Sequence, residues 1–142
     1  MAAKHILGCV DFSEHSNRAL AEVGEYAQAY GSKVTLIHVS DPHAFIPPQA
    51  ALEPLAAAND EAARKIALEQ LRDHNLAGVE TEVAWIEGTA PAKAICDYAE
   101  SHGVDLIVVG SHGRGGVERW LLGSVAERVV RHATCNVYVV RR

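Results

Sequence analysis

Residues 106–125 read LIVVGSHGRGGVERWLLGSV, a run of apolar residues followed by a glycine-rich segment. The continuous apolar core of residues 104–109 predicts a parallel strand that is buried on both faces. Ser124 precedes a stripe of apolar residues at helical spacing and is the predicted N-cap of a helix. That stripe comprises Val125, Ala126, Val129, Val130 and Ala133. The stretch therefore predicts a strand that is joined to a helix by a long loop.

The loop has the composition of a phosphate site. Four glycines fall within the seven residues from Gly110 to Gly116. Because glycine has no β-carbon, the backbone can approach a ligand closely and turn its N–H groups toward it. The helix start at Ser124 adds unpaired amides and the positive end of the helix dipole. Together these features favour the binding of a phosphate group.

Two common phosphate loops do not fit. A Walker A loop requires Gly-Lys-Ser or Gly-Lys-Thr before the helix, whereas residues 122–124 read Leu-Gly-Ser. A dinucleotide fingerprint that begins at Gly113 would require a third glycine where Glu118 stands. What remains is Gly110, two residues, Gly113, nine residues, and then glycine and serine. This spacing resembles the G-x2-G-x9-G-(S/T) signature of the universal stress protein family, in its ATP-binding branch.

The resemblance extends along nearly the whole chain, in the order of that family. Residues 5–14, HILGCVDFSE, are similar to its opening strand and its Asp-x-Ser-Glu turn. Residues 34–39 and 135–140 are similar to its second and last strands. Cys9 is a departure, because relatives often carry proline or another small residue beside the adenine; the size of cysteine is compatible with that position.

Strands and helices alternate along the chain. Apolar patterns predict strands at residues 5–10, 33–39, 79–86, 104–109 and 136–140. Right-handed crossovers between parallel strands place helices on both faces of one sheet, which gives a three-layer, Rossmann-like α/β fold. The family resemblance implies the strand order 3-2-1-4-5, in which the chain reverses direction between strands one and four. Ligands bind at such a reversal.

Each predicted helix has a face that is expected to be buried. Ser13, with Ser16 as an alternative, caps the first helix, Gly31 ends it, and Pro91 fits the first turn of the third. Alternation in residues 79–86 predicts a half-exposed strand near a sheet edge, and the prolines after Asp41 predict a loop or a lid. The expected buried positions are Leu20, Val23, Ala27 and Tyr30 in the first helix, Ala63, Ile66, Ala67 and Leu71 in the second, and Ala94, Ile95 and Tyr98 in the third.

The resemblance implies that the carboxyl ends of the strands hold the nucleoside. Asp11 would accept hydrogen bonds from a ribose hydroxyl or from the base, and Cys9 and Val10 would lie beside the nucleoside. The alternative is that the Asp11 side chain caps the local backbone at Ser13 or Glu14. Val39 would use its backbone amide and carbonyl at the adenine edge, and on pattern alone it is a core valine.

The glycine loop would hold the phosphates. Gly113 and Gly123 would keep the wall of the phosphate site free of β-carbons. The alternative is that both glycines serve only as turn residues and contact no ligand. Ser124 would add its hydroxyl, and Ser124 and Val125 their amides. The other residues expected on the phosphate side are Gly110, Ser111, His112, Arg114 and Gly115, of which His112 and Arg114 could equally point into water. Mg²⁺ would be carried by the phosphates, and no protein ligand for a metal is predicted. For Trp120, Leu121 and Leu122, contacts with the core or a partner are favoured over ligand stacking.

Composition limits the other possibilities. With 142 residues, 49% of them hydrophobic, the chain fits one compact domain over residues 1–142. The net charge of −5 argues against nucleic acid or an acidic membrane as a partner, although arginines exceed glutamates from residue 110 to 132 and suit a small anion. The spacings of the three cysteines and eight histidines predict neither disulfides nor a metal site. Without an apolar leader or a membrane-length apolar run, the expected location is the cytoplasm.

Three classes of function follow. The preferred one is an ATP-binding regulatory protein in which the nucleotide orders the loop and changes the surface shown to a regulatory partner, without obligatory turnover. A slow ATPase is the second, although only Asp11 and Ser124 offer plausible metal contacts. A partner-binding dimer with an empty cleft is the third, and the complete glycine signature counts against it. The resemblance also implies a homodimer through the edge strand at residues 136–140, unless Arg141 and Arg142 guard a monomer's edge.

Overall fold

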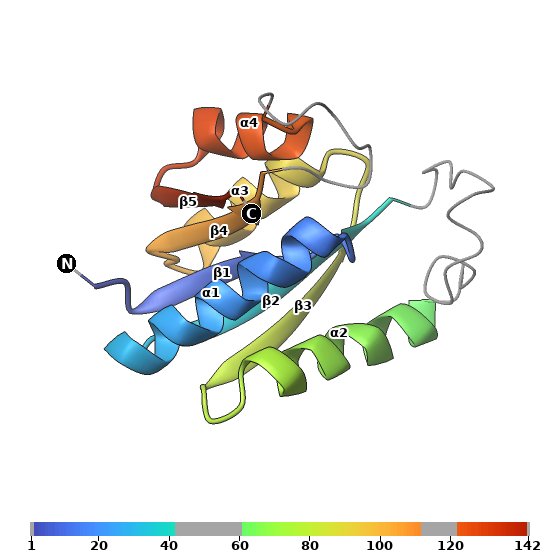
Figure 1. The fold of residues 1–142 in the computed structure, drawn as a ribbon. Helices are drawn as coiled ribbons and strands as arrows, with labels where there is room; N and C mark the ends of the chain where they lie inside the picture. Colours follow the sequence, from blue (N-terminus) through green and yellow to red (C-terminus); the bar gives the residue numbers. More distant parts are fainter. Residues whose placement is uncertain (1, 42–60, 112–121, 142) are drawn as a thin grey trace.

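The computed structural model describes residues 2–41, 61–111 and 122–141 (Figure 1). One sheet of five strands runs in the order β3-β2-β1-β4-β5, and every neighbouring pair is parallel. The strands are β1 (His5–Cys9), β2 (Lys33–Ser40), β3 (Thr81–Glu87), β4 (Leu106–Gly110) and β5 (Asn136–Val140). The helices between them are α1 (Glu14–Tyr30), α2 (Glu61–Asn75), α3 (Pro91–Ser101) and α4 (Ser124–His132). The predicted alternation and strand order are confirmed.

Helices cover both faces of the sheet. Figure 1 shows α1 and α2 in front of the strands, with α3 and α4 on the other side. One apolar cluster joins α1 and α2 to the sheet, and a second joins α3 and α4 to it. Ile6 and Leu7 belong to different clusters although they are consecutive in β1, and both are 0% exposed. Successive side chains of a strand point to opposite faces, so a strand covered on both sides needs an unbroken apolar run.

The reversal of chain direction lies between β1 and β4. From β1 the chain crosses to β2 on one side, whereas β4 pairs with β1 on the other, with Gly8 opposite Val108. The carboxyl ends of these two strands therefore lie side by side. In a parallel sheet this arrangement leaves a crevice between the loops that leave each strand, which is where ligands bind in such folds.

The helices are amphipathic, and each packs along a narrower stripe than the sequence indicated. Tyr30, Ile66, Val125 and Val130 were expected to be buried, but they are 60%, 56%, 38% and 48% exposed. Tyr30 lies in the last turn of α1 and contacts Tyr26 with a tilted ring, the ring centroids being 4.6 Å apart. In α2 Ala67 is buried and Leu71 packs against the core as predicted, whereas Leu68 is buried in place of Ile66. In α4 only Ala126 and Val129 are buried, because this helix covers the margin of the sheet.

The two edge strands differ in their surroundings. β3 forms one edge, as its alternating sequence predicted, and Lys33 of neighbouring β2 pairs with Glu82 of β3 at 3.0 Å. β5 forms the other edge, where Tyr138 is 48% exposed.

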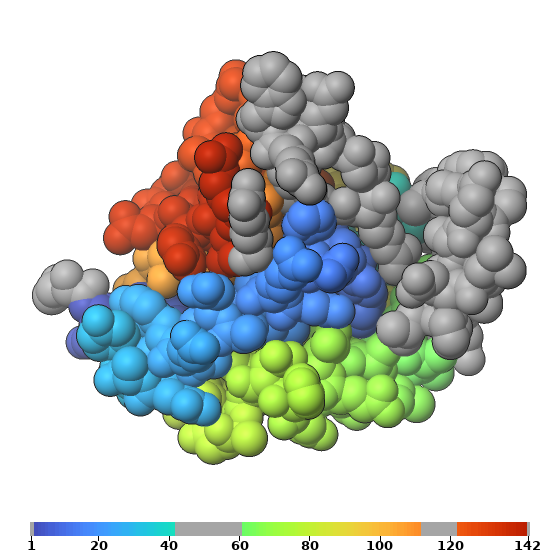
Figure 2. Space-filling view, viewed as in Figure 1, coloured from blue at the N-terminus to red at the C-terminus, as the bar shows by residue number. Residues whose placement is uncertain are grey.

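In Figure 2, blue helix α1 lies between green α2 and the red C-terminal part of the chain. Within the described ranges, no helix has the length and apolar character to cross a bilayer.

Candidate functional site

The chain leaves β1 through a tight turn that carries Asp11. Asp11 Oδ1 accepts a hydrogen bond from the Ser13 amide at 2.8 Å. Ser13 Oγ in turn accepts one from the Ser16 amide at 3.2 Å, which confirms Ser13 as the N-cap of α1. The hydrogen bond that the local-cap interpretation of Asp11 predicted is therefore present. A contact between this carboxylate and a ligand stays a prediction.

Phe12, between Asp11 and Ser13, has a φ of 63°. Among the described residues, Phe12 is the one residue other than glycine that has a positive φ. For a residue with a bulky side chain this conformation costs about 1–3 kcal/mol, and such strain collects at functional sites. The turn that carries Asp11 is thus held in a conformation that its own sequence does not favour.

Gly110, the last residue of β4, lies against the first turn of α1. A β-carbon on Gly110 would come within 3.0 Å of the His15 carbonyl carbon and 3.2 Å of the Ser16 amide nitrogen. Glycine is therefore needed here for the packing of α1 against β4, whether or not a ligand binds. It brings the start of α1 to the end of β4 and narrows the crevice at the chain reversal.

The two ends of the glycine loop meet at Ser111. The Ser111 amide donates to the Val140 carbonyl at 2.9 Å, and its own carbonyl accepts from the Gly123 amide at 2.7 Å. Ser111 is 1% exposed, so its side chain lies inside the protein. The loop that leaves β4 thus returns to the carboxyl end of the same strand before α4 begins.

Helix α4 starts one residue earlier than predicted. Gly123 is the N-cap and Ser124 the first helical residue, so the prediction that Ser124 caps the helix is wrong. The Gly123 carbonyl accepts the first helical hydrogen bond, from the Glu127 amide at 2.9 Å, and no side chain caps the helix. Ser124 and Val125 are exposed. The first turn of α4 therefore presents its amides without a side chain of the N-cap across them.

The remaining predicted residues divide into two groups. Val39, near the end of β2, packs against the apolar cluster under α3 and α4, which agrees with its interpretation as a core valine. Leu122 packs against the same cluster, as expected for a core contact. Six predicted positions lie outside the described residues: His112, Gly113, Arg114, Gly115, Trp120 and Leu121.

Cys9 borders this region as a neutral packing residue. Burial raises the pKa of its thiol well above the usual range, and the neighbouring Asp11 carboxylate raises it further. A buried thiol with a raised pKa is a poor nucleophile, because the thiolate is the reactive form. All three cysteines are free, and among the described residues no group of side chains could hold a metal ion. Cys9 therefore contributes size and shape to the site.

His38 was not singled out by its sequence. Its Nδ1 lies 2.7 Å from the Val10 carbonyl oxygen, directly before Asp11, and the residue is 7% exposed. A histidine within an apolar strand has the pattern of a core residue, and its contacts come from residues far away in the sequence. A titratable side chain in a run of buried apolar residues was the only signal that could have found it.

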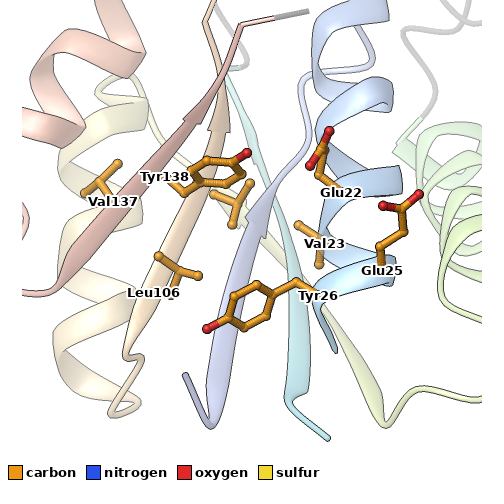
Figure 3. Close-up of a pocket in the computed structure, with 8 residues that line it drawn as sticks. Glu22, Val23, Glu25, Tyr26, Leu106, Val137 and Tyr138 are labelled. Carbon is orange, nitrogen blue, oxygen red and sulfur yellow. The ribbon is translucent and has the colours of Figure 1, made fainter. Parts of the chain in front are cut away.

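Two hollows lie elsewhere on the molecule. A groove of about 520 Å³ lies between α1 and β4–β5. Figure 3 shows Tyr26 on its α1 side, with Leu106 and Tyr138 on the strands opposite. Glu22 and Glu25 line its α1 side, so the groove disfavours a polyphosphate. The second, of about 500 Å³, lies between α3 and α4 and mixes acidic and basic side chains. Neither is lined by a residue of the predicted nucleotide site.

The whole chain is similar to one protein family. Residues 2–141 match the model of the universal stress protein family. A universal stress protein of Thermus aquaticus is 35% identical over 138 residues, which cover 97% of this chain and 98% of that protein.

Solved structures agree with this match. The universal stress protein UspA from Lactobacillus plantarum superposes with a TM-score of 0.78 at 33% identity, over 97% of each chain. A universal stress protein in complex with cAMP superposes with a TM-score of 0.70 at 25% identity, over 99% of this chain and 98% of that one. The fold, the strand order and the match over nearly all residues lead to one conclusion. The chain belongs to the universal stress protein family.

Proposed function

We propose that the protein is a cytosolic regulatory protein that binds an adenine nucleotide, ATP with Mg²⁺, between the carboxyl ends of β1 and β4. The observation that carries the proposal is the junction at Ser111, whose carbonyl accepts from the Gly123 amide at 2.7 Å. This bond brings the end of β4 and the start of α4 together beside β1. A similar protein in complex with cAMP supports an adenine nucleotide as the ligand.

The donors at this junction fit phosphate chemistry. Gly123 has no β-carbon, and the Ser124 and Val125 amides lie in the first turn of α4, at the positive end of its dipole. His112, Gly113, Arg114 and Gly115 would add the rest of the phosphate contacts. Mg²⁺, a hard cation that prefers oxygen ligands, would be held mainly by the phosphates. Asp11, with Cys9, Val10 and Val39, would contact the nucleoside.

Fast hydrolysis is not part of the proposal. Rapid phosphoryl transfer needs charge neutralisation and a positioned nucleophile, usually through a lysine and metal carboxylates. The chain has no lysine after Lys93. Backbone amides bind the ground state about as well as the transition state, which lowers the dissociation constant without lowering the barrier. We expect turnover below about one per second, the low end of ordinary enzymes.

Thermal unfolding with and without nucleotide tests the proposal. At a nucleotide concentration about 100 times Kd, binding should stabilise the fold by about 2.7 kcal/mol and raise Tm by roughly 10 °C. Gly123→Val should fold, because its φ of −59° suits any residue, and should lose the shift. Gly88→Ala, which adds a β-carbon alone, is the control, since the nearest described atom, Val39 Cγ1, would lie at 3.9 Å, an ordinary contact. The absence of a shift with ATP, ADP, AMP and cAMP at millimolar concentration would overturn the proposal.

We also infer a homodimer formed by antiparallel pairing of β5 with β5 of a second copy. An edge strand with apolar side chains is a template for such pairing, and Tyr138 is 48% exposed on β5. Tyr138→Glu would place like charges near the two-fold axis and should give a monomer by light scattering. Tyr30→Glu, at a residue that is 60% exposed away from the edge, should stay dimeric. A monomeric wild type would show that the terminal arginines guard the edge.

A further inference from the structure

His38 lies at the centre of a row of contacting side chains whose aromatic rings are tilted relative to one another. Its ring centroid is 4.7 Å from that of Phe12 and 4.7 Å from that of Trp85. Lys65 of α2 lies over the Trp85 ring, 5.7 Å from the centroid. The row therefore connects the turn after β1 with β2, β3 and α2, and His38 contacts the turn itself.

The hydrogen bond from His38 has a defined direction. A backbone carbonyl can only accept, so His38 Nδ1 carries a proton and donates it to the Val10 oxygen at 2.7 Å. The Val10 amide donates to the Ile37 carbonyl of β2 at 2.9 Å. β2 thus fixes both backbone polar groups of Val10, one through its main chain and one through the His38 ring.

His38 contacts the residues on both sides of Asp11. It binds Val10 through the hydrogen bond and Phe12 through the ring contact. Phe12 is the strained residue of the turn, and a positive φ persists only where the surroundings over-determine it. Packing of the Phe12 ring on His38 supplies such a constraint for the turn that carries Asp11.

We propose that His38 is a positioning residue that holds the strained turn at residues 10–13 and thereby fixes Asp11 for the adenine nucleotide. This inference rests on the proposed function, and it proposes that a side chain of β2 fixes the geometry of a carboxylate in the turn after β1. His38 acts through the turn and needs no contact with the ligand.

The first measurement is ATP affinity by calorimetry in two variants. His38→Phe keeps an aromatic ring between Phe12 and Trp85 but removes the donor to Val10. Loss of that hydrogen bond should raise Kd roughly tenfold. His38→Asn places an amide N–H where Nδ1 stands and should recover part of the loss. His5→Phe is the matched control, because it removes a histidine hydrogen bond, to Thr35 Oγ1 at 2.8 Å, at the opposite end of the same strand pair.

A double-mutant cycle separates positioning from a loss of general stability. If His38 acts through Asp11, His38→Phe should have little further effect on Kd in an Asp11→Ala background. A general loss of stability would reduce affinity by the same factor in both backgrounds. Equal factors, or an unchanged Kd in His38→Phe, would overturn the proposal.

Amide hydrogen exchange in the nucleotide-free protein supplies a readout that does not depend on ligand binding. The Ser13 and Ser16 amides donate to Asp11 and Ser13 within the turn. Both should lose protection in His38→Phe and keep it in His5→Phe. Unchanged protection would overturn the positioning role. A wild type that binds no adenine nucleotide, with protection lost in His38→Phe, would overturn the proposed function and leave the role of His38 in the turn supported.

Discussion

The two ends of the sheet are built by different means. At the amino ends of the strands, loops turn through residues with unusual backbone angles and open surroundings. At the carboxyl ends, the described residues have ordinary backbone angles except at Phe12, and contacts between different elements, such as that of Gly110 with α1, hold the strand ends in place. The comparison separates a part of the molecule that local geometry stabilises from a part whose geometry depends on its neighbours.

The amino end shows the first pattern clearly. The positive-φ glycines of the described chain, Gly31, Gly78 and Gly103, each lie just before β2, β3 or β4. A β-carbon on any of them would meet nothing within 4 Å. Asp105 joins the starts of β4 and β1, since its Oδ2 accepts from the Lys4 and His5 amides at 2.9 Å each. These features end helices and begin strands.

The carboxyl end shows the second pattern. Gly110 lies against the backbone of α1, Ser111 joins β5 to the start of α4, and His38 supports the strained turn after β1. Each of these contacts holds two elements at the crevice where α/β folds bind ligands. Substitutions that disrupt these three contacts should therefore affect stability and nucleotide binding together, whereas those at the positive-φ glycines of the amino end should affect stability alone.

Two substitutions, Gly110→Ala and Gly88→Ala, test this contrast. Gly110→Ala should cause the larger loss of stability. Its β-carbon would lie 3.0 Å from the His15 carbonyl carbon and 3.1 Å from the carbonyl oxygen, so the first turn of α1 must shift. Overpacking of this kind costs about 1–3 kcal/mol. Urea unfolding should show this loss, and calorimetry should show weaker ATP binding, because the turn with Asp11 leads into α1.

Gly88→Ala is the control at the same end of the sheet. The nearest atom to its added β-carbon is Val39 Cγ1 at 3.9 Å, an ordinary contact. Its stability should remain within about 0.5 kcal/mol of wild type, as for most substitutions without a packing conflict. If Gly110→Ala were tolerated equally well, close packing would not distinguish the carboxyl end.

Much of the fold could be predicted because the central strands are unambiguous. Residues 6–7 and 107–109 are apolar without interruption, and only a strand covered on both faces needs that pattern. The strand order came from the family resemblance, since the pattern does not order parallel strands. In α2 only the choice of Ile66 was wrong, because Ile66 and Leu68 both continue an apolar stripe through Ala67, and only tertiary packing selects between them.

The candidate site could be predicted only where a residue's role depends on its neighbours in the sequence. The capping role of Ser13 follows from its position before a helix, whereas α4 begins one residue early, with Gly123 at the N-cap and no side-chain cap, although Ser124 has the residue type that favours a cap. His38 could not be predicted, because its proposed role depends on Val10 and Phe12, which lie far away in the sequence, in the turn after β1. The junction of Ser111 and Gly123 depends in the same way on how a long loop closes.

Apart from the Gly88→Ala control, the smallest effect on stability among these tests is expected at Gly31, at the amino end of the sheet. Gly31 ends α1 with a φ of 67° and a ψ of 33°, in the left-handed region. Because no atom lies within 4 Å of an added β-carbon, Gly31→Ala introduces backbone strain without a steric conflict. The free energy of unfolding should fall by about 1 kcal/mol.

Asparagine provides the matched test, because it tolerates left-handed angles better than other residues that carry a β-carbon. Gly31→Asn should therefore recover part of the stability that Gly31→Ala loses in urea unfolding. Both variants should bind ATP with the wild-type Kd, since Gly31 lies at the end of α1 that is remote from Asp11 and Ser13. Equal losses in the two variants would show that space, and not the backbone angle, selects glycine here. A change in Kd would show that the two ends of the sheet are coupled, and the contrast between them would then fail.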